Sequence, residues 1–307
     1  MTRPLLLAVG IVLGILVTAT VVTGLIRLLK PQANVSEVIA RIKSWWVMAA
    51  VVIVAVLTSD ETALFFWALV CFWALKEFFS LVPGRLVDRT AIFFAYAAIP
   101  VQFYWIHAKW YGMFIIFIPV YLFLWIPFVL MLAGEPKGFV VASSRIHWGL
   151  MTFVFGLSHA AFLLELPPKA GFDAGSRGLF FYLVLLTELN DVFQFLCGKT
   201  FGRHRITPLI SPKKTWEGFV GGVLLTTPLA VALRFLTPLS LWQAVGAGAI
   251  LSIFGFIGDV VISAVKRDAG VKDSSNAIPG HGGVLDRIDS LCYTAPLFFH
   301  YIYYLAY

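Results

Sequence analysis

Residues 111–133 read YGMFIIFIPVYLFLWIPFVLMLA, an apolar run that contains no charged side chain. About 20 consecutive apolar residues are enough to cross the hydrocarbon core of a bilayer as an α-helix. The composition of the whole chain agrees, since 60% of the residues are hydrophobic, only 13% are charged and the mean hydropathy is +0.89. Charged residues make up about a quarter of a typical soluble domain. The sequence therefore predicts an all-α, polytopic integral membrane protein.

Similar apolar segments flank this run on both sides. A helix satisfies its own backbone polar groups, so each segment is expected to form a membrane helix. Ten spans are predicted, at 4–29, 44–58, 62–76, 89–106, 111–133, 146–166, 178–197, 218–236, 242–263 and 290–307. The second and third are short, so a re-entrant hairpin and a total of eight or nine spans are alternatives. The first is interpreted as an uncleaved helix, because it is too long for the apolar region of a signal peptide.

The chain shows no soluble domain and no internal repeat. Residues 1–307 are therefore interpreted as one membrane domain. Its N-terminal helical part is 1–177, and its C-terminal part, 178–307, carries the polar loops 198–217 and 264–289. These two loops are the candidates for catalysis.

The basic residues are distributed unevenly between the loops. If alternate loops share a side, 17 of the 23 Lys and Arg residues lie in five loops on one side, and four lie in the opposite loops and the N-terminus. Basic loops of membrane proteins usually remain in the cytoplasm. We therefore expect a multi-pass protein of the bacterial inner (cytoplasmic) membrane, with both polar loops cytoplasmic. Because the charge is dispersed and no recognition module is visible, nucleic acid is not expected as a partner.

Four aspartates are the first candidates for a site. Asp191 and Asp259 lie within apolar segments, where a charged side chain is costly and is expected to face a partner or water. Asp286 and Asp289 lie on one face if a helix includes both. Carboxylates without accompanying His and Cys suit a hard cation such as Mg²⁺ and not zinc. Helix capping is the alternative for Asp286 and Asp289, but it leaves Asp259 unexplained.

Basic side chains flank these acids in both polar loops. Such residues often mark only topology, but their alternation with acids and hydroxyls favours a site that neutralises a triphosphate. The candidate cations are Lys213, Lys214, Lys266, Arg267 and Lys272. Backbone amides of the turn at Gly282 and Gly283 are suited to holding a phosphate. His281, in the same turn, is interpreted as a general base, a phosphate donor or a loop anchor.

The stretch SAVKRDAGVKDSSNAIPGHGGVLDRID, residues 263–289, resembles the signature of the phosphatidate cytidylyltransferases (CDP-diglyceride synthases). The matching positions are Ser263, Lys266, Arg267, Lys272, Asp273, Pro279, His281, Gly282, Gly283, Asp286, Arg287 and Asp289. SPKKTWEG, residues 211–218, resembles the second motif of that family, and Asp191 stands in the place of its preceding acid. The convincing resemblance covers about residues 187–290, whereas the first 150 residues share only their hydrophobicity with the family.

The resemblance implies that CTP and phosphatidate react to give CDP-diacylglycerol and pyrophosphate. It implies a catalytic Mg²⁺ and a second, monovalent cation such as K⁺. The expected metal ligands are Asp191, Asp259, Asp286, Asp289 and, for the monovalent cation, Ser263. The expected catalytic residues are Asp259, Lys266, Arg267, His281, Asp286 and Asp289. The expected substrate-binding residues are Ser211, Lys213, Lys214, Lys272, Asp273, Gly282, Gly283 and Arg287.

One motif departs from the family pattern. Members usually carry small residues around the first acid, as in Ala-Asp-Thr-Gly-Ala-Tyr, whereas this chain has Asn-Asp-Val-Phe-Gln-Phe at 190–195. A related CTP-dependent enzyme on another lipid, either a kinase or an archaeal-type CDP-lipid synthase, is therefore an alternative. A transporter of an anionic solute would place acids at mid-membrane in several spans, whereas the charges here cluster in two loops. A homodimer is a further expectation.

Overall fold

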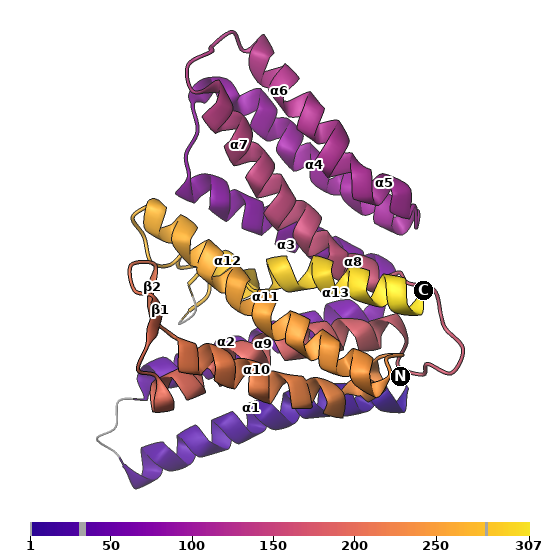
Figure 1. The fold of residues 1–307 in the computed structure, drawn as a ribbon, viewed down its shortest axis with the longest axis vertical. Coiled ribbons are helices and arrows are strands. Elements are labelled where there is room, and N and C mark those ends of the chain that lie inside the picture. Colours follow the sequence, from indigo (N-terminus) through magenta and orange to yellow (C-terminus); the bar gives the residue numbers. More distant parts are fainter. Residues whose placement is uncertain (1, 31–34, 280–281) are drawn as a thin grey trace.

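The computed structural model describes residues 2–30, 35–279 and 282–307 and shows a bundle of helices (Figure 1). The uninterrupted long helices are α1 Arg3–Leu29, α2 Ser36–Thr58, α3 Asp60–Leu81, α4 Arg89–His107, α9 Gly175–Phe201, α10 Trp216–Ala232, α11 Leu241–Asp268 and α13 Leu291–Ala306. Two further rods each contain a π-helical segment: α5 Tyr111–Ile116, η2 Phe117–Leu122 and α6 Phe123–Leu132, then α7 Phe139–Gly149, η3 Leu150–Gly156 and α8 Leu157–Leu164. The short elements are η1 Leu86–Asp88, β1 Arg205–Thr207, β2 Ser211–Thr215, η4 Arg234–Leu236 and α12 Leu285–Ile288.

Within the described residues, eight helical rods are long and apolar enough to cross a membrane. They confirm the predicted all-α, polytopic architecture. The predicted spans 218–236 and 290–307 correspond to α10 and α13, which are shorter, with 17 and 16 residues. Helices α2 and α3 have 23 and 22 residues. Both are long enough to cross the bilayer, so their length no longer favours a re-entrant hairpin.

The junction between α2 and α3 is a single residue, Ser59. Its side chain accepts a hydrogen bond from the backbone N–H of Thr62 at 3.1 Å. A serine at this position satisfies one of the N–H groups that a helix start leaves without an intrahelical partner. The cap therefore allows α3 to begin directly where α2 ends.

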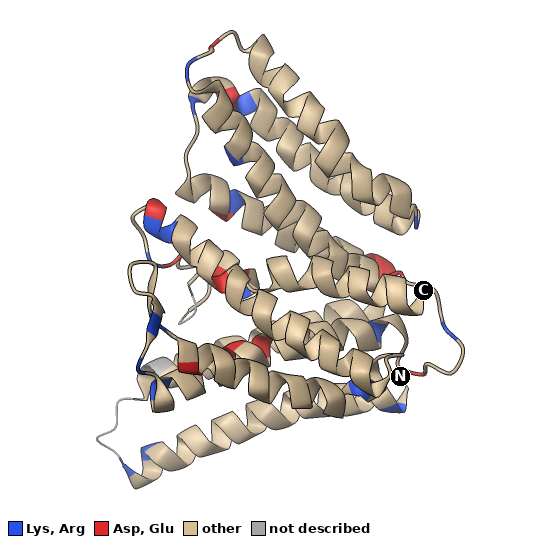
Figure 2. Cartoon of the chain, viewed as in Figure 1, with Lys and Arg blue, Asp and Glu red and all other residues tan. Residues whose placement is uncertain are grey.

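The chain termini and the polar elements lie at opposite ends of the bundle (Figure 1). Both termini are at one end, and the β hairpin and α12 are at the other. The loops that follow α3, α6, α9 and α11 all lie at the hairpin end, and Lys and Arg residues are found along it (Figure 2). The predicted alternation of loops between two sides is therefore present in the fold.

The helices pack in a layered arrangement around α8. All of its residues are buried, and it contacts α3, α9 and α13. Helices α4 and α6 lie on one side of this centre, whereas α9, α10 and α11 pack against one another on the other side (Figure 1). The second group carries the candidate aspartates of the long helices, Asp191 and Asp259.

Two local features differ from the sequence-based prediction. Helices α9 and α11 continue to Phe201 and Asp268, so Lys266 and Arg267 are helical and not part of a loop. The predicted spans ended at the apolar limit, but a helix can continue into water once it has started. A two-stranded antiparallel hairpin, β1 and β2, was also not predicted.

Candidate functional site

A cavity of about 720 Å³ lies at the hairpin end, bordered by α9, β2, α11 and α12. It brings together residues from both polar loops. The polar and charged residues that line it are Glu188, Asp191, Gln194, Lys199, Ser211, Lys213, Lys214, Thr215, Asp259, Lys266, Asp273, Asp286, Arg287 and Asp289. Every expected metal ligand except Ser263 is therefore in this lining.

Strand β2 positions the two lysines of the SPKKTWEG motif. Neighbouring side chains of a strand point to opposite faces, and here Lys213 is exposed whereas Lys214 is half-buried. The strand ends where Thr215 caps α10, because its Oγ1 accepts from the backbone N–H of Gly218 at 3.1 Å. The motif thus consists of a strand followed at once by a capped helix, and this arrangement directs Lys214 inward.

Lys214 is the cation at the centre of the α9–α11 side of the cavity. Its Nζ lies 2.6 Å from Asp259 Oδ2 and donates to Gln194 Oε1 at 3.1 Å. Burial acts to lower the pKa of Lys214, but the carboxylates of Asp259 and Asp191 outweigh it, so the pKa is raised. Ser263 donates to the other oxygen, Asp259 Oδ1, at 3.2 Å. Lys214 therefore remains protonated and partly neutralises the carboxylates.

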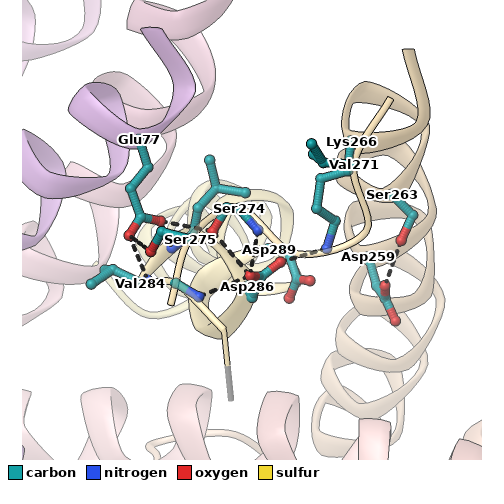
Figure 3. A network of polar contacts seen from close by, with 12 residues as sticks. Glu77, Asp259, Ser263, Lys266, Val271, Ser274, Ser275, Val284, Asp286 and Asp289 are labelled. Carbon is teal, nitrogen blue, oxygen red and sulfur yellow. Dashed lines mark hydrogen bonds and ion pairs between the residues drawn. The ribbon is translucent and has the colours of Figure 1, made fainter. Parts of the chain in front are cut away.

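Asp286 is hydrogen-bonded through both of its oxygens (Figure 3). Oδ1 lies 2.6 Å from Lys266 Nζ. Oδ2 accepts from Ser274 N at 2.8 Å, Ser274 Oγ at 2.9 Å and Gly283 N at 2.9 Å. Burial opposes ionisation of Asp286, but Lys266 and these donors lower its pKa below the usual value. With four donors around it, this carboxylate organises the loop, and its role as a metal ligand stays a prediction.

The carboxylates of Asp191 and Asp289 are less well compensated. Asp191 Oδ2 accepts from Ser290 Oγ at 2.9 Å, whereas Asp191 Oδ1 is buried without a hydrogen-bond partner among the described residues. Asp289 Oδ1 accepts from Ser290 N at 2.9 Å. Burial raises the pKa of Asp289 well above its usual value, and the nearby Asp259 and Asp191 raise it further. A bound cation would offset this cost and favour the ionised carboxylate.

The donor set fits Mg²⁺ in its chemistry but is not assembled into a complete cage. In residues 2–30, 35–279 and 282–307, no three His, Cys, Asp or Glu side chains are close enough together to hold a metal ion. Mg²⁺ takes oxygen ligands and is usually bound by one or two carboxylates, substrate phosphates and water. The unpaired oxygen of Asp191 fits that mode of binding. The site therefore fits a Mg²⁺ ion that binds together with a phosphate substrate.

The remaining expected residues lie around the cavity. Arg267 donates to the backbone carbonyl of Ile210 at 3.1 Å and to that of Val271 at 2.7 Å, so it joins the two polar loops. Lys272 is exposed and does not line the cavity. Ser263 does not line the cavity but donates a hydrogen bond to Asp259.

The glycine turn before α12 was expected to hold a phosphate. Gly282 has φ +81°, a conformation that favours glycine, and its carbonyl accepts from Ile278 N at 2.7 Å. The N–H of Gly283 is directed to Asp286, which occupies the amide that was expected to bind phosphate. His281 lies outside the described residues.

Sequence reasoning missed three residues that the structure places at or beside the site, namely Glu77, Glu188 and Gln194. Glu188 lines the cavity one helical turn before Asp191. Glu77, in α3, is buried and contacts the loop before α12 (Figure 3). The only signal for Glu77 was a single acid at the end of an apolar run, because the predicted span stopped at residue 76.

Gln194 lies within the motif that departs from the family pattern. Its Oε1 accepts from Lys214, whereas its Nε2 is buried and has no partner in the described part of the chain. A Cβ atom at Gly222 would lie 2.4 Å from Gln194 Cγ, so a glycine in α10 makes room for this side chain. Gln194 also lines the cavity.

The sequence matches known proteins over nearly all of its length. The profile of the Cytidylyltransferase family matches residues 39–305. Uncharacterized protein YnbB of Escherichia coli (strain K12) is 40% identical over 295 residues, which cover 96% of this chain and 97% of that protein. A phosphatidate cytidylyltransferase of Staphylococcus haemolyticus (strain JCSC1435) is 31% identical over 262 residues, covering 82% and 94%. One of Staphylococcus aureus (strain COL) is 37% identical over 196 residues, covering 61% and 74%.

The family match begins well before the first candidate aspartate. The sequence-based limit of about 187–290 was therefore too narrow, because the match includes helices α3 to α8. Hydrophobic helices leave few distinctive residues, which is why the N-terminal part shared only its hydrophobicity with the family at first sight. With the match covering most of the chain and the two polar loops meeting at one cavity, the protein belongs to the cytidylyltransferase family.

Proposed function

We propose that this protein transfers CMP from CTP to phosphatidate and so forms CDP-diacylglycerol and pyrophosphate. The observation that carries the proposal is the cavity itself, in which Lys214 and Lys266 are paired with aspartates at one end of a membrane bundle. Membership of the cytidylyltransferase family and two relatives named phosphatidate cytidylyltransferase support it.

The proposed reaction does not require a strong general base. An oxygen of the lipid phosphate forms a bond to the α-phosphorus of CTP, and the bond between that phosphorus and the oxygen bridging to the β-phosphate breaks. Pyrophosphate leaves with the bonding electron pair. A phosphate monoester has a second pKa of about 6 and is largely deprotonated at neutral pH, so no strong general base is needed. The protein must neutralise two anions and align them.

The basic residues of the cavity are assigned to the phosphates, and the acidic residues to the cation. Lys214 and the exposed Lys213 are placed to bind the triphosphate, and Lys266 and Arg287 provide positive charge near α12. Asp191, together with Asp259 or Asp289, would hold Mg²⁺ when a phosphate substrate is bound. When bound, that ion supplies further neutralisation of the phosphates. The monovalent cation expected near Ser263 stays a prediction.

We place the cavity on the cytoplasmic side, where CTP is found. The basic loops at the hairpin end support this orientation through their excess of Lys and Arg. In a cysteine-free background, single cysteines at the exposed positions Thr200 and Asn276 should react with an impermeant maleimide only after the membrane is opened. A cysteine at the exposed Ser240 should react in intact cells. Labelling of Thr200 and Asn276 from opposite sides would exclude a shared active site.

A second candidate is cytidylyl transfer to a different lipid phosphate. It is supported by Gln194, which lines the cavity at a position where the family usually has a small residue. Phosphatidate and this alternative share the same reaction and differ only in the acceptor. A panel of acceptors therefore separates them.

The test uses purified protein in detergent with Mg²⁺, a panel of lipid phosphates and CTP labelled at either the α- or the γ-phosphorus. Cytidylyl transfer carries the α-label into the lipid product and releases the γ-label as pyrophosphate. A CTP-dependent kinase would place the γ-label on the lipid. The proposal requires α-label in CDP-diacylglycerol with phosphatidate as the best acceptor, and a better acceptor from the panel would establish the second candidate. Detergent-corrected mass measurement of the same sample tests the expected homodimer.

A further inference from the structure

Glu77 makes three hydrogen-bond contacts with the loop before α12 and one with the first residue of that helix, although it belongs to the N-terminal half of the chain (Figure 3). Its Oε1 accepts from Ser275 Oγ at 2.8 Å and from Val284 N at 3.1 Å. Its Oε2 accepts from Ser274 Oγ at 2.8 Å and from Leu285 N at 2.9 Å. Each carboxylate oxygen thus lies against one hydroxyl and one backbone N–H, and the single proton of the Ser274 hydroxyl is shared between Glu77 and Asp286.

The surrounding chain is shaped to admit this carboxylate. Glu77 is only 6% exposed. A Cβ atom at Gly283 would lie 2.4 Å from Glu77 Oε2 and 2.1 Å from Ser274 Oγ, so any other residue at this position would displace the contact. In α2, Ser44 adds a second tether, since its Oγ donates to the carbonyl of Pro279 at 2.7 Å. Two N-terminal helices therefore hold the same loop.

Ser274 connects Glu77 directly to the cavity. Its Oγ lies 2.8 Å from Glu77 Oε2 and 2.9 Å from Asp286 Oδ2. Asp286 in turn contacts Lys266 Nζ, which lines the cavity. A continuous line of contacts thus runs from α3 through Ser274 and Asp286 to Lys266 on α11, and Figure 3 shows these side chains directed toward one another. Displacing Glu77 removes a support from Asp286 without touching the cavity.

We propose that Glu77 is a positioning residue for cytidylyl transfer, which fixes the loop before α12 so that Asp286 and Lys266 are held in their reacting arrangement. The inference rests on the proposed function for its kinetic consequence. The restraint of this loop by one buried carboxylate of α3 does not depend on which reaction the protein catalyses.

The first variant is Glu77→Gln, which keeps the size and removes one acceptor oxygen. Hydroxyls can turn to accept, but a backbone N–H cannot, and each oxygen of Glu77 serves one backbone N–H. Whichever way the amide turns, the N–H of Val284 or that of Leu285 therefore loses its acceptor. Partners of this outer kind commonly cost about 10- to 100-fold in activity when removed. We expect kcat to fall at least about 10-fold, with KM for CTP changed much less.

Glu61→Gln is the matched control, because Glu61 is an exposed acid in the first turn of the same helix. It should retain wild-type kcat and KM. If Glu77→Gln keeps more than about half of wild-type kcat, the positioning role is wrong.

Variants of two neighbouring serines distinguish an effect on catalysis from an effect on stability. Ser274→Ala and Ser275→Ala each remove one hydroxyl from Glu77, but only Ser274 also contacts Asp286. We expect similar thermal stability in the two variants and a kcat at least several-fold lower for Ser274→Ala. This comparison remains available if Glu77→Gln does not fold. Equal kcat values in the two serine variants would contradict the proposed route through Asp286.

Limited trypsin digestion tests the tether without any assay of activity. Lys272 is exposed in the loop that Glu77 holds, and cleavage after it yields a fragment that ends at residue 272. We expect this fragment to appear several-fold faster in Glu77→Gln than in the wild type or in Glu61→Gln. An unchanged rate would overturn the tether. If the wild type forms no CDP-lipid but Glu77→Gln releases the loop, the proposed function fails while the restraint by Glu77 stands.

Discussion

The two sides of the cavity differ in how completely their carboxylates are hydrogen-bonded. On the α12 side, seven donor groups surround Asp286 and Glu77 behind it, and the hydroxyl of Ser274 is shared between the two carboxylates. On the α9 side, Asp191 keeps one buried oxygen without a partner among the described residues. Buried polar groups are normally paired. The comparison indicates that the α12 side is a preorganised frame, whereas the α9 side is left open for a ligand.

The largest loss of activity is expected from Asp259→Asn, on the α9–α11 side of the cavity. Asp259 holds Lys214 at 2.6 Å and is a proposed ligand of Mg²⁺, so the change removes charge from both. Because loss of an outer partner alone commonly costs about 10- to 100-fold, we expect kcat/KM to fall more than about 100-fold. Steady-state assays and size-exclusion chromatography measure activity and folding. An activity above about a tenth of wild type would argue against direct ligation.

The next largest difference is expected in thermal stability, between a variant on the α12 side and one on the α9 side. Asp286→Asn leaves Lys266 buried without its ion pair, and breaking a buried pair in this way costs about 3–5 kcal/mol. We therefore expect the Tm in detergent to fall by at least about 5 °C. Asp191→Asn removes a carboxylate with an unpaired oxygen and should leave the Tm nearly unchanged. A similar loss of Tm in both variants would remove the distinction between frame and open side.

A smaller difference is expected between the two adjacent lysines of β2, in their effect on KM for CTP. Lys214 is half-buried against Asp259, whereas Lys213 is exposed and screened by solvent. We expect Lys214→Ala to raise KM for CTP about 10-fold or more, and Lys213→Ala to raise it only several-fold, since exposed charge pairs contribute about 0.2–1 kcal/mol. Measuring KM for phosphatidate in parallel tests the assignment. A selective effect on the lipid would assign this strand to the acceptor.

The smallest expected effect concerns pH. The pKa of Asp289 is raised by burial and by Asp259 and Asp191, so Asp289 takes up a proton more readily than an ordinary aspartate as pH falls. Metal binding requires the deprotonated carboxylate. The Mg²⁺ concentration for half-maximal activity should therefore rise as pH falls, by at most about tenfold per pH unit for a single proton. Asp289→Asn should flatten this dependence, and an unchanged slope would exclude Asp289 as its source.

Much of the fold followed from the sequence because membrane insertion is decided locally. A run such as residues 111–133 predicts a helix without knowledge of its neighbours. The sequence also predicted that Asp259 faces a partner or water, because a charged side chain in an apolar helix is costly. The structure supplied that partner from the neighbouring polar loop.

Other features depend on contacts between distant residues. Glu77 and Ser274 are separated by 197 positions, and nothing in the run around Glu77 indicates where its carboxylate points. Asp286 was expected to ligate a metal, which stays a prediction, and the sequence did not indicate that its oxygens contact Ser274, Gly283 and Lys266. Whether a carboxylate is occupied or available is a property of the packed structure. The spacing of acids along the chain does not contain it.

The central claim is that the cavity between the two polar loops transfers CMP from CTP to a lipid phosphate. The most direct measurement is the stoichiometry of products formed by purified wild-type protein and by Asp259→Asn, with phosphatidate and CTP labelled at the α-phosphorus. We predict one pyrophosphate released for each labelled CDP-diacylglycerol formed by the wild type, and neither product above background for the variant. Pyrophosphate without labelled lipid, or equal product from both proteins, would contradict the account.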